Sequence, residues 1–247
     1  MNFKNIIRTT LNFLQLDLTK NLEYDRLTKL IMKRVINSGS NCIDIGCHKG
    51  EILDIIIKFS PNGKHYGFEP IPQLFNKLNE KYKNKATIFP YALSNENGYS
   101  TFQYVKNAPA YSGIKKRRYD IDKPEIEEIK VEMKKLDDLI PANIKIDLIK
   151  IDVEGGEFGV LVGGIQLLKK DKPTIIFECG LGASEYYGTI PANLFNFITN
   201  ETGLQISLLK SFLYNRKPLE LKEFEYYYNT NKEYYFIAYN QDTHSIT

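Results

Sequence analysis

The sequence is poor in cysteine and histidine, with three of each among 247 residues. Cys42, Cys47 and Cys179 are odd in number and lie in or beside segments with the apolar character of buried strands. This pattern argues against a disulfide framework and indicates reduced intracellular thiols. A structural zinc site is also disfavoured, because no C-x-x-C motif and no group of histidines accompanies the cysteines.

The sequence also has neither a large charge excess nor a long apolar run. Lys and Arg number 33 against 30 Asp and Glu, and a net charge of +3 does not indicate a nucleic-acid binder. No apolar run approaches the roughly 18 residues of a membrane span, and the N-terminus lacks the apolar core and cleavage site of a signal peptide. We therefore expect a cytoplasmic protein without an integral membrane span. Its length suits one large α/β domain.

Short apolar, β-branched runs alternate with stretches of helical period, which predicts a mostly parallel sheet with helices on both faces. One helix is clear, because apolar residues recur at helical spacing from Phe158 to Leu168, directly after an acidic run. The last two strands are expected to form an antiparallel hairpin, since residues 215–231 hold no convincing crossover helix. The expected strands are residues 42–45, 65–68, 87–92, 146–151, 174–177, 205–209 and 234–239.

The middle of the chain departs from this rhythm. Residues 99–105 and 129–133 alternate in the manner of antiparallel strands, with a basic, Tyr-containing loop between them. This pattern predicts a small insertion around residues 95–140 that lies over the cleft of the domain.

The N-terminal part of the chain suggests two helices. We expect residues 1–40 to form a helical extension of the main domain at 41–247, with an apolar stripe that includes Phe3, Ile7 and Leu14. The stripe either packs on the domain or makes a homo-oligomer or membrane-surface contact.

A glycine-spaced turn follows the first expected strand. Asp44, Gly46, Cys47 and Gly50 fall at the carboxyl edge of the sheet, where backbone approaches a ligand closely and the next helix presents free N–H groups. A dinucleotide fingerprint would carry its second glycine at position 48, but His48 stands there, and its Cβ obstructs a pyrophosphate. The Asp44 carboxylate would likewise repel a phosphate, yet it suits S-adenosylmethionine, which carries an ammonium and a sulfonium group. The turn therefore predicts a site for S-adenosylmethionine.

A second anchor for this cofactor is Glu69, which ends the second expected strand. It lies roughly 20 residues beyond the turn, where an acid typically binds ribose hydroxyls. Alternatively, Glu69 is a surface acid at a helix entry before Pro70. Ala92 and Leu93 end the third expected strand and are candidates for contact with an adenine ring, although a plain turn explains them equally well.

The densest charged run, residues 150–157, ends the next central strand. Burial of an unpaired carboxylate costs on the order of several kcal/mol, so Asp152 and Glu154 are expected to face a cleft, with Asp152 at the reaction centre. Alternatively, both acids cap the following helix. Glu178 ends the neighbouring strand and could meet Asp152 across the sheet edge to hold an acceptor's hydroxyls. A divalent metal between these two acids is an alternative that is not favoured.

S-adenosylmethionine is a methyl donor, and if the group that accepts the methyl is a hydroxyl, a nearby side chain is expected to draw off its proton. Asp152 is the leading candidate, with Glu154, Glu178 and His48 behind it. His48 is either a solvated loop residue or a base near the cofactor. The basic residues 115–118 form either a solvated loop or a patch for an anionic acceptor.

Taken together, these motifs resemble the FkbM-type family of S-adenosylmethionine-dependent methyltransferases over residues 40–180. The Lys-x-Asp-x-Glu-Gly-x-Glu run is the specific element, and the other motifs are shared with many S-adenosylmethionine enzymes. The sequence departs from the family at Cys47 and His48, where Ala-Asn is usual. The motifs are Ile43-Asp44-Ile45-Gly46 with Gly50, Gly67-Phe68-Glu69-Pro70, Ala92-Leu93-Ser94 with Gly98, Leu136-Asp137-Asp138-Leu139, and the run from Lys150 to Glu157.

The resemblance implies a Rossmann-like class I methyltransferase fold with seven strands, the last pair antiparallel. It also implies O-methylation of a hydroxyl on a sugar, a glycan or a small natural product. Two other functions remain open: an NAD(P)-dependent oxidoreductase on the same sheet, which His48 disfavours, and a non-catalytic scaffold that binds the cofactor. The expected partner is the small-molecule or glycan acceptor, and no nucleic acid.

Overall fold

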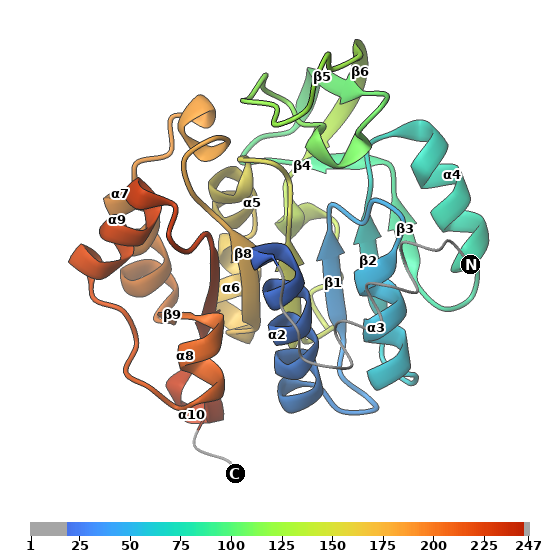
Figure 1. The fold of residues 1–247 in the computed structure, drawn as a ribbon. Helices are drawn as coiled ribbons and strands as arrows, with labels where there is room; N and C mark the ends of the chain where they lie inside the picture. Colours follow the sequence, from blue (N-terminus) through green and yellow to red (C-terminus); the bar gives the residue numbers. More distant parts are fainter. Residues whose placement is uncertain (1–18, 245–247) are drawn as a thin grey trace.

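The computed structural model describes residues 19–244, and Figure 1 shows their path. The apolar stripe predicted between Phe3 and Leu14 lies outside these residues, so its packing stays a prediction. The first described helix is α2 (Lys20–Val35), whose N-cap residue Thr19 accepts a hydrogen bond from the Leu22 N–H. No helix in the described part of the chain is long and apolar enough to cross a membrane.

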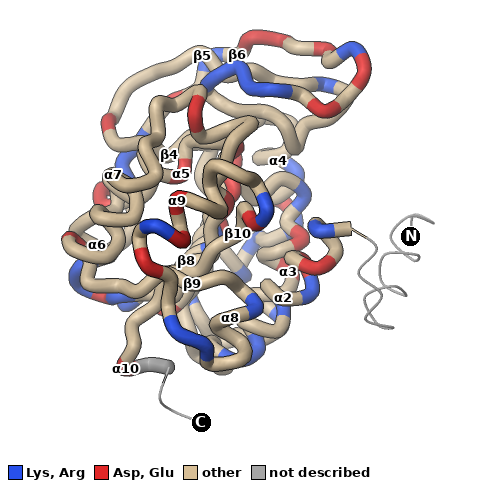
Figure 2. The backbone as a smooth tube through the Cα atoms, turned by 60° about the vertical axis from the view of Figure 1, so that its left-hand side comes forward, with Lys and Arg blue, Asp and Glu red and all other residues tan. Residues whose placement is uncertain are grey.

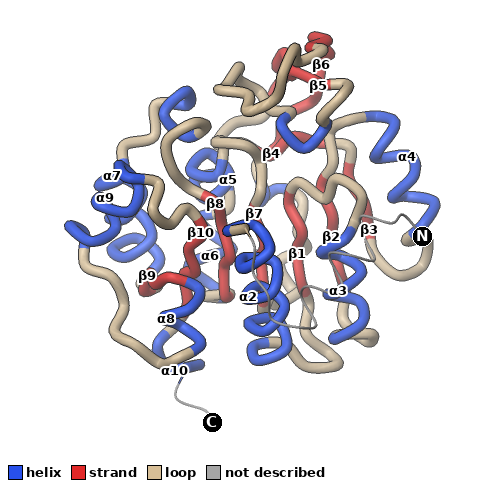
Figure 3. Tube along the Cα trace, viewed as in Figure 1, coloured by secondary structure: helices blue, strands red, loops and turns tan. Residues whose placement is uncertain are grey.

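A seven-stranded sheet forms the centre of the molecule, with the strand order β3-β2-β1-β7-β8-β10-β9 (Figure 3). Strand β10 runs antiparallel to both of its neighbours, and the other pairs are parallel. The predicted, mostly parallel sheet with an antiparallel last pair is therefore confirmed. The strands are β1 (Cys42–Ile45), β2 (His65–Phe68), β3 (Thr87–Phe89), β7 (Leu148–Ile151), β8 (Thr174–Glu178), β9 (Gln205–Leu208) and β10 (Tyr235–Tyr239).

Helices cover both faces of this sheet, as predicted. Strands β1 and β7 are buried along their whole length, which explains why they read as continuous apolar runs. Successive side chains alternate between the two cores, so Cys42 packs on one face and Ile43 on the other. The first face carries α2, α3 (Glu51–Phe59), α4 (Pro72–Lys81) and α8 (Leu209–Leu213), and the second carries α5 (Glu157–Gly163), α6 (Ile165–Asp171), α7 (Pro191–Asn196), the π-helix η4 (Phe197–Glu201) and α9 (Leu221–Thr230).

Two helices differ from the prediction. The helix expected from Phe158 to Leu168 is divided into α5 and α6 at Gly164. Helix α9 lies in the segment where the sequence predicts no helix. Its capping box joins Glu220 and Glu223, but the signal is hidden because the rest of the segment is polar and rich in tyrosine. The short α10 (Gln241–His244) ends the described chain.

The third expected strand is also divided, and its second half joins a separate sheet. Pro90 lacks the N–H that would continue the ladder, so β3 ends at Phe89 and β4 (Tyr91–Leu93) pairs elsewhere. The separate sheet has the order β4-β6-β5. Its long strands, β5 (Gly98–Val105) and β6 (Ile126–Lys134), are antiparallel, which confirms the pairing predicted for this region.

The small sheet stands above the carboxyl ends of the parallel strands (Figure 1). Ile71, Ala92 and Phe102 belong to the apolar cluster beneath it. The loop at residues 106–125 connects β5 to β6 and contains the 3₁₀-helix η1 (Pro109–Tyr111). Two further 3₁₀-helices, η2 (Leu136–Asp138) and η3 (Ser184–Tyr187), lie in connections near the same sheet edge.

The turn after β1 touches the turn after β7. Gly46 has a φ of +86°, and a Cβ at this position would overlap the carbonyl oxygen of Asp152. The Asp152 N–H also donates to the Ile45 carbonyl at 2.9 Å. Only glycine combines this backbone conformation with so close an approach.

We predict that Gly46→Ala lowers the free energy of unfolding by at least about 2 kcal/mol, because it adds both a steric overlap and an unfavourable left-handed residue. Urea unfolding followed by circular dichroism measures the loss. Gly39→Ala is the matched control, since the nearest atom to its added Cβ is Asn37 Oδ1 at 3.7 Å. A similar loss in both variants would contradict the close contact.

Candidate active site

Two cavities meet at the carboxyl edge of the large sheet. The narrow pocket, of about 70 Å³, runs from the end of β1 past β2 and β4 to the small sheet. The wide cleft, of about 860 Å³, lies between α2, the turn after β1 and the ends of β7 and β8. The residues that line both cavities, named the junction, are Gly46, His48, Ala110, Asp152 and Glu154.

The glycine turn divides into residues that face the cavities and residues that support the turn. Gly46 and His48 belong to the junction, and Cys47 lines the wide cleft. Asp44 and Gly50 line neither of these cavities. Gly50 begins α3 in a left-handed conformation, and its carbonyl accepts a hydrogen bond from the Tyr82 hydroxyl at 2.6 Å.

Asp44 lies beneath the turn with 1% of its surface exposed. Burial raises the pKa of Asp44 to about 7, although the charge of Lys150 acts in the opposite direction. Its Oδ2 atom has no hydrogen-bond partner among the described residues. The sequence assigns Asp44 to direct cofactor contact, whereas the structure places its carboxyl group below the cavity surface.

Glu69 directly follows β2 and lines the narrow pocket, and two backbone N–H groups hold its carboxylate in place. The His48 N–H donates to Oε2 at 2.8 Å, and the Ile71 N–H donates to Oε1 at 2.9 Å. Burial nevertheless raises the pKa of Glu69 to about 7. Since each oxygen holds one backbone donor, each retains a lone pair for a ligand hydroxyl. Ala92 and Leu93 line the same pocket.

His48 supplies one of the two backbone N–H groups that bind Glu69, and the residue also lines the junction. The residue has a left-handed φ of 49°, which turns its N–H toward Glu69. Burial lowers the pKa of the imidazole, and the charge of Lys49 acts in the same direction. The buried Nε2 atom has no hydrogen-bond partner in the described part of the chain. His48 is therefore a neutral ring at neutral pH.

Asp152 is held as an ion at the junction. The Lys150 ammonium donates to Oδ2 at 3.0 Å, and the Tyr235 hydroxyl donates to the same oxygen at 2.6 Å. Burial raises the pKa of Asp152, but the charge of Lys150 and these hydrogen bonds outweigh burial and hold the pKa below its usual value. A carboxylate with a lowered pKa is a weak base, so this arrangement disfavours the leading role that the sequence gives Asp152 in proton removal.

The other acids of the charged run have different partners. Glu154 forms an ion pair with Arg117, which reaches the junction from the loop above. Glu157 begins α5 and accepts hydrogen bonds from the N–H groups of Val153 (3.1 Å) and Gly155 (3.2 Å). Glu157 therefore shapes the turn between β7 and α5.

Glu178 differs from these acids because its carboxyl group makes no hydrogen bond or ion pair with another side chain or N–H group among the described residues. It ends β8, lies opposite Tyr235 in the sheet register and lines the wide cleft. Burial raises the pKa of Glu178 to about 8, with further contributions from Asp152 and Glu157 that outweigh the charges of Lys150 and Arg117. Glu178 can therefore exchange a proton with a ligand in the cleft near neutral pH.

Several functional candidates carry little sequence signal. Lys150 lies in a buried strand, and the acid two residues later is the available hint of its partner. Tyr235 is the second residue of the last expected strand and contacts Asp152, which lies 83 residues earlier in the sequence. Of the basic residues 115–118, Arg117 turns inward, whereas Arg118 is exposed and pairs with Asp120.

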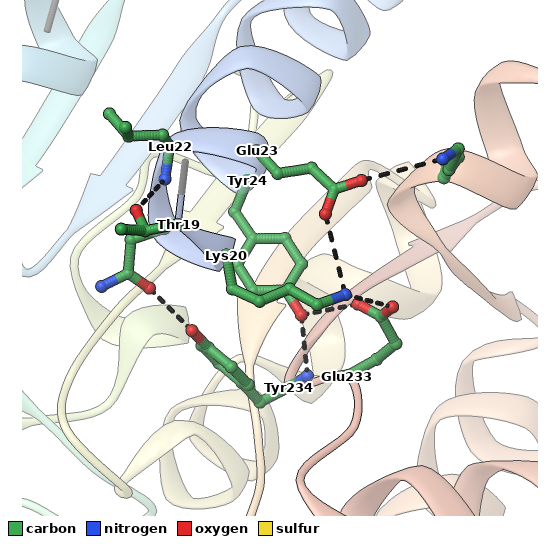
Figure 4. Close-up of polar contacts among 9 residues, drawn as sticks. Thr19, Lys20, Leu22, Glu23, Tyr24, Glu233 and Tyr234 are labelled. Atoms are coloured by element: carbon green, nitrogen blue, oxygen red, sulfur yellow. Dashed lines mark hydrogen bonds and ion pairs between the residues drawn. The ribbon is translucent and has the colours of Figure 1, made fainter. Parts of the chain in front are cut away.

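Helix α2 forms one wall of the wide cleft and is fixed at both ends. Lys20 and Tyr24 donate to the Glu233 carboxylate at 2.7 and 2.6 Å (Figure 4). At the other end Arg34 donates to the Leu213 carbonyl at 3.1 Å. The lining residues recur at helical spacing and are Asn21, Tyr24, Asp25, Thr28 and Lys29.

Across residues 19–244, no three His, Cys, Asp or Glu side chains converge in a way that could hold a metal ion. Asp152 and Glu178 do line the same cleft, as the sequence predicts. Lys150 and Tyr235 already donate to Oδ2 of Asp152, so Asp152 and Glu178 together offer few free carboxylate oxygens to a cation.

Comparisons with known proteins identify the family of the chain. The family model described as "Methyltransferase FkbM domain" matches residues 44–202. A crystal structure of methyltransferase FkbM from Methylobacillus flagellatus KT is similar, with a TM-score of 0.50, 16% sequence identity and coverage of 83% of this chain. The matched region spans 44% of that protein's length. A SAM-dependent methyltransferase from Aquifex aeolicus has a TM-score of 0.46 and 14% identity, over 94% of this chain and 96% of that one. No curated protein sequence matches the chain.

The raised pKa of Glu178 predicts a fall in stability as the pH rises from about 4.5 to about 8. Because the folded state raises the pKa of Glu178 to about 8, it binds more protons than the unfolded chain between about pH 4.5 and 8. The stabilising contribution is therefore complete at acid pH and lost as the pH rises through 8. We expect Glu178→Gln to flatten the decline in Tm between pH 5.5 and 8.5 by at least about 2–4 °C, the shift that about 1 kcal/mol produces in a chain of this size.

Differential scanning calorimetry across this range measures the decline. Glu201→Gln is the control, because this exposed acid forms a surface ion pair with Lys169. Identical pH dependence in wild type and Glu178→Gln would show that the Glu178 pKa is not raised.

Proposed function

The chain belongs to the FkbM methyltransferase family, whose model matches residues 44–202, and from this premise we propose that it is an S-adenosylmethionine-dependent O-methyltransferase. The proposed acceptor is a hydroxyl group of a sugar, a glycan or another polyhydroxylated molecule. The observation that carries the proposal is the meeting of a narrow pocket and a wide cleft at one ionised carboxylate, Asp152.

The residues of the narrow pocket fit the adenosine part of the cofactor. Glu69 presents two carboxylate oxygens that are fixed by backbone donors and retain lone pairs, as recognition of two ribose hydroxyls requires. Ala92, Leu93 and Phe102 supply apolar walls that suit a purine ring. When bound, S-adenosylmethionine supplies an electrophilic methyl group on a sulfonium ion.

The wide cleft fits a polar acceptor. Tyrosine rings from α2, the loop at 106–125 and the start of β10 share its surface with carboxyl and amide groups. Such a mixture provides many hydrogen-bonding groups and little continuous apolar surface, which favours an acceptor with several hydroxyls. The cleft residues that support this assignment are Asn21, Tyr24, Tyr111, Glu178, Asn231 and Tyr234.

We assign proton removal to Glu178. The group lines the acceptor side of the site, and its pKa of about 8 lies near the pH of a cell interior. A general base is most effective when its pKa is near the working pH, because it is then both ionised in part and a good proton acceptor. Asp152, whose pKa is lowered, and the neutral His48 are the weaker candidates.

The remaining expectations are part of the same proposal. The cysteines are free and buried, which supports a reducing, cytoplasmic location. Basic and acidic residues are interspersed along the described chain in Figure 2, which supports a small-molecule or glycan partner over a nucleic acid. We infer a domain at 41–247 with an insertion around 95–140, preceded by an extension at 1–40 whose helix α2 packs on the domain. A homo-oligomer contact through this extension stays a prediction.

The first prediction concerns Glu69 and S-adenosylhomocysteine, the product form of the cofactor. Glu69→Ala should weaken binding by roughly 10- to 150-fold, because hydrogen bonds to a charged group contribute about 1.5–3 kcal/mol. Isothermal calorimetry measures the dissociation constant. Glu80→Ala, at an exposed position of α4, should bind as wild type does. If a folded Glu69→Ala variant bound S-adenosylhomocysteine with unchanged affinity, Glu69 would not belong to the cofactor site. A separate measurement tests the rival function: tight binding of NADH by the wild type would argue for an oxidoreductase.

The second prediction concerns the acceptor and the base together. Incubation with carbon-13-labelled S-adenosylmethionine and a panel of monosaccharides should give a methylated sugar, detected by NMR.

We expect kcat/KM to rise with pH and level off near pH 8, as Glu178 ionises. Glu178→Gln should lower kcat by about 10²–10⁴ and remove the rise, with little change in S-adenosylhomocysteine affinity. A Glu178→Gln variant that keeps the wild-type pH profile would exclude Glu178 as the base.

A further inference from the structure

The Asp152 carboxylate is held through one of its two oxygens. Both the Lys150 ammonium and the Tyr235 hydroxyl donate to Oδ2, at 3.0 and 2.6 Å. A carboxylate oxygen accepts about two hydrogen bonds, so these donors saturate Oδ2. The side chain of Asp152 is 32% exposed and lines both cavities. The oxygen that remains for a ligand is therefore Oδ1.

Tyr235 cannot easily turn away from Asp152. Its ring centroid lies 4.8 Å from that of Tyr24 on α2 and 4.7 Å from the Lys150 ammonium nitrogen. Tyr24 is anchored in turn, because its hydroxyl donates to the Glu233 carboxylate at 2.6 Å (Figure 4). A continuous set of contacts thus joins the start of α2 to the orientation of the Asp152 carboxylate.

We propose that Tyr235 is a positioning residue which, together with Lys150, directs Oδ1 of Asp152 toward the α-ammonium group of the methyl donor. This inference rests on the proposed function, because it takes the ligand of the junction to be S-adenosylmethionine. An ionised carboxylate can only accept hydrogen bonds, and an ammonium group can only donate them. The resulting contact is charge-assisted and therefore stronger than a neutral hydrogen bond.

The neighbouring acids are less suited than Asp152 to bind the α-ammonium group. Asp44, which the sequence assigns to the cofactor site, is almost fully buried and lines neither cavity. Glu154 is paired with Arg117. Glu178 lines the wide cleft but not the narrow pocket, on the side assigned to the acceptor. Asp152 combines a place at the junction, a lowered pKa and an oxygen, Oδ1, that neither Lys150 nor Tyr235 contacts.

The test compares two ligands that differ in the amino-acid part. S-adenosylhomocysteine carries the ammonium group, and 5′-methylthioadenosine lacks it. Calorimetry of Tyr235→Phe should show about 5- to 20-fold weaker binding of S-adenosylhomocysteine and unchanged binding of 5′-methylthioadenosine, a smaller effect than loss of the charged partner itself. Asp152→Asn should weaken S-adenosylhomocysteine by about 10- to 150-fold. Tyr99→Phe is the matched control, because this exposed tyrosine of β5 lines neither cavity.

The double variant separates positioning from packing. If Tyr235 acts through Asp152, Tyr235→Phe has no further effect on S-adenosylhomocysteine binding in the Asp152→Asn background. An equal loss in both backgrounds, an equal loss for 5′-methylthioadenosine, or no loss in Tyr235→Phe would each overturn the proposal. Failure of the wild type to bind S-adenosylhomocysteine would instead overturn the proposed function.

Discussion

Burial of carboxyl groups, reinforced by repulsion between their like charges, is the constraint on which the site depends. Acids from several strand ends converge at one sheet edge, where Lys150 and Arg117 are the cations that act on Glu178. Each acid meets the constraint differently. Asp152 and Glu154 are paired with a cation, Glu69 and Glu157 receive backbone N–H groups, and Glu178 retains its proton to a higher pH. Burial and the different partners of these carboxyl groups give them distinct chemical roles, although they carry the same functional group.

The parts of the fold that the sequence predicts well are those with a local cause. Strands β1 and β2 are short apolar runs that end in a turn, and they lie within the predicted bounds. Gly46 and Glu69 follow from their positions at strand ends, and the structure places both on a cavity. The split between β3 and β4 is also local, because Pro90 interrupts the ladder, yet an apolar run conceals it.

The missed parts have causes that are distant in the sequence. Nothing near Tyr235 indicates that its hydroxyl reaches Asp152, because the contact exists only once β10 lies beside β8. Arg117 belongs to a basic run that reads as a solvated loop, and only the small sheet carries it to Glu154. Burial of Asp44 likewise depends on the packing of α3 on the sheet.

The family match begins at Asp44, so the cleft wall formed by α2 lies outside it. Under the proposed function, this helix contributes Asn21, Asp25 and Thr28 to the acceptor side, whereas its Tyr24 also contacts Tyr235.

The buried acids with raised pKa values also bear on how long the protein survives in a cell. Their ionisation at neutral pH opposes folding, and a cationic ligand in the junction would relieve part of that repulsion. Any ligand that binds the folded state alone lowers the unfolded population by mass action. Since proteases act on unfolded chains, the supply of the methyl donor would set the abundance of the protein as well as its rate. When the donor is scarce, molecules without it would be the first to be degraded.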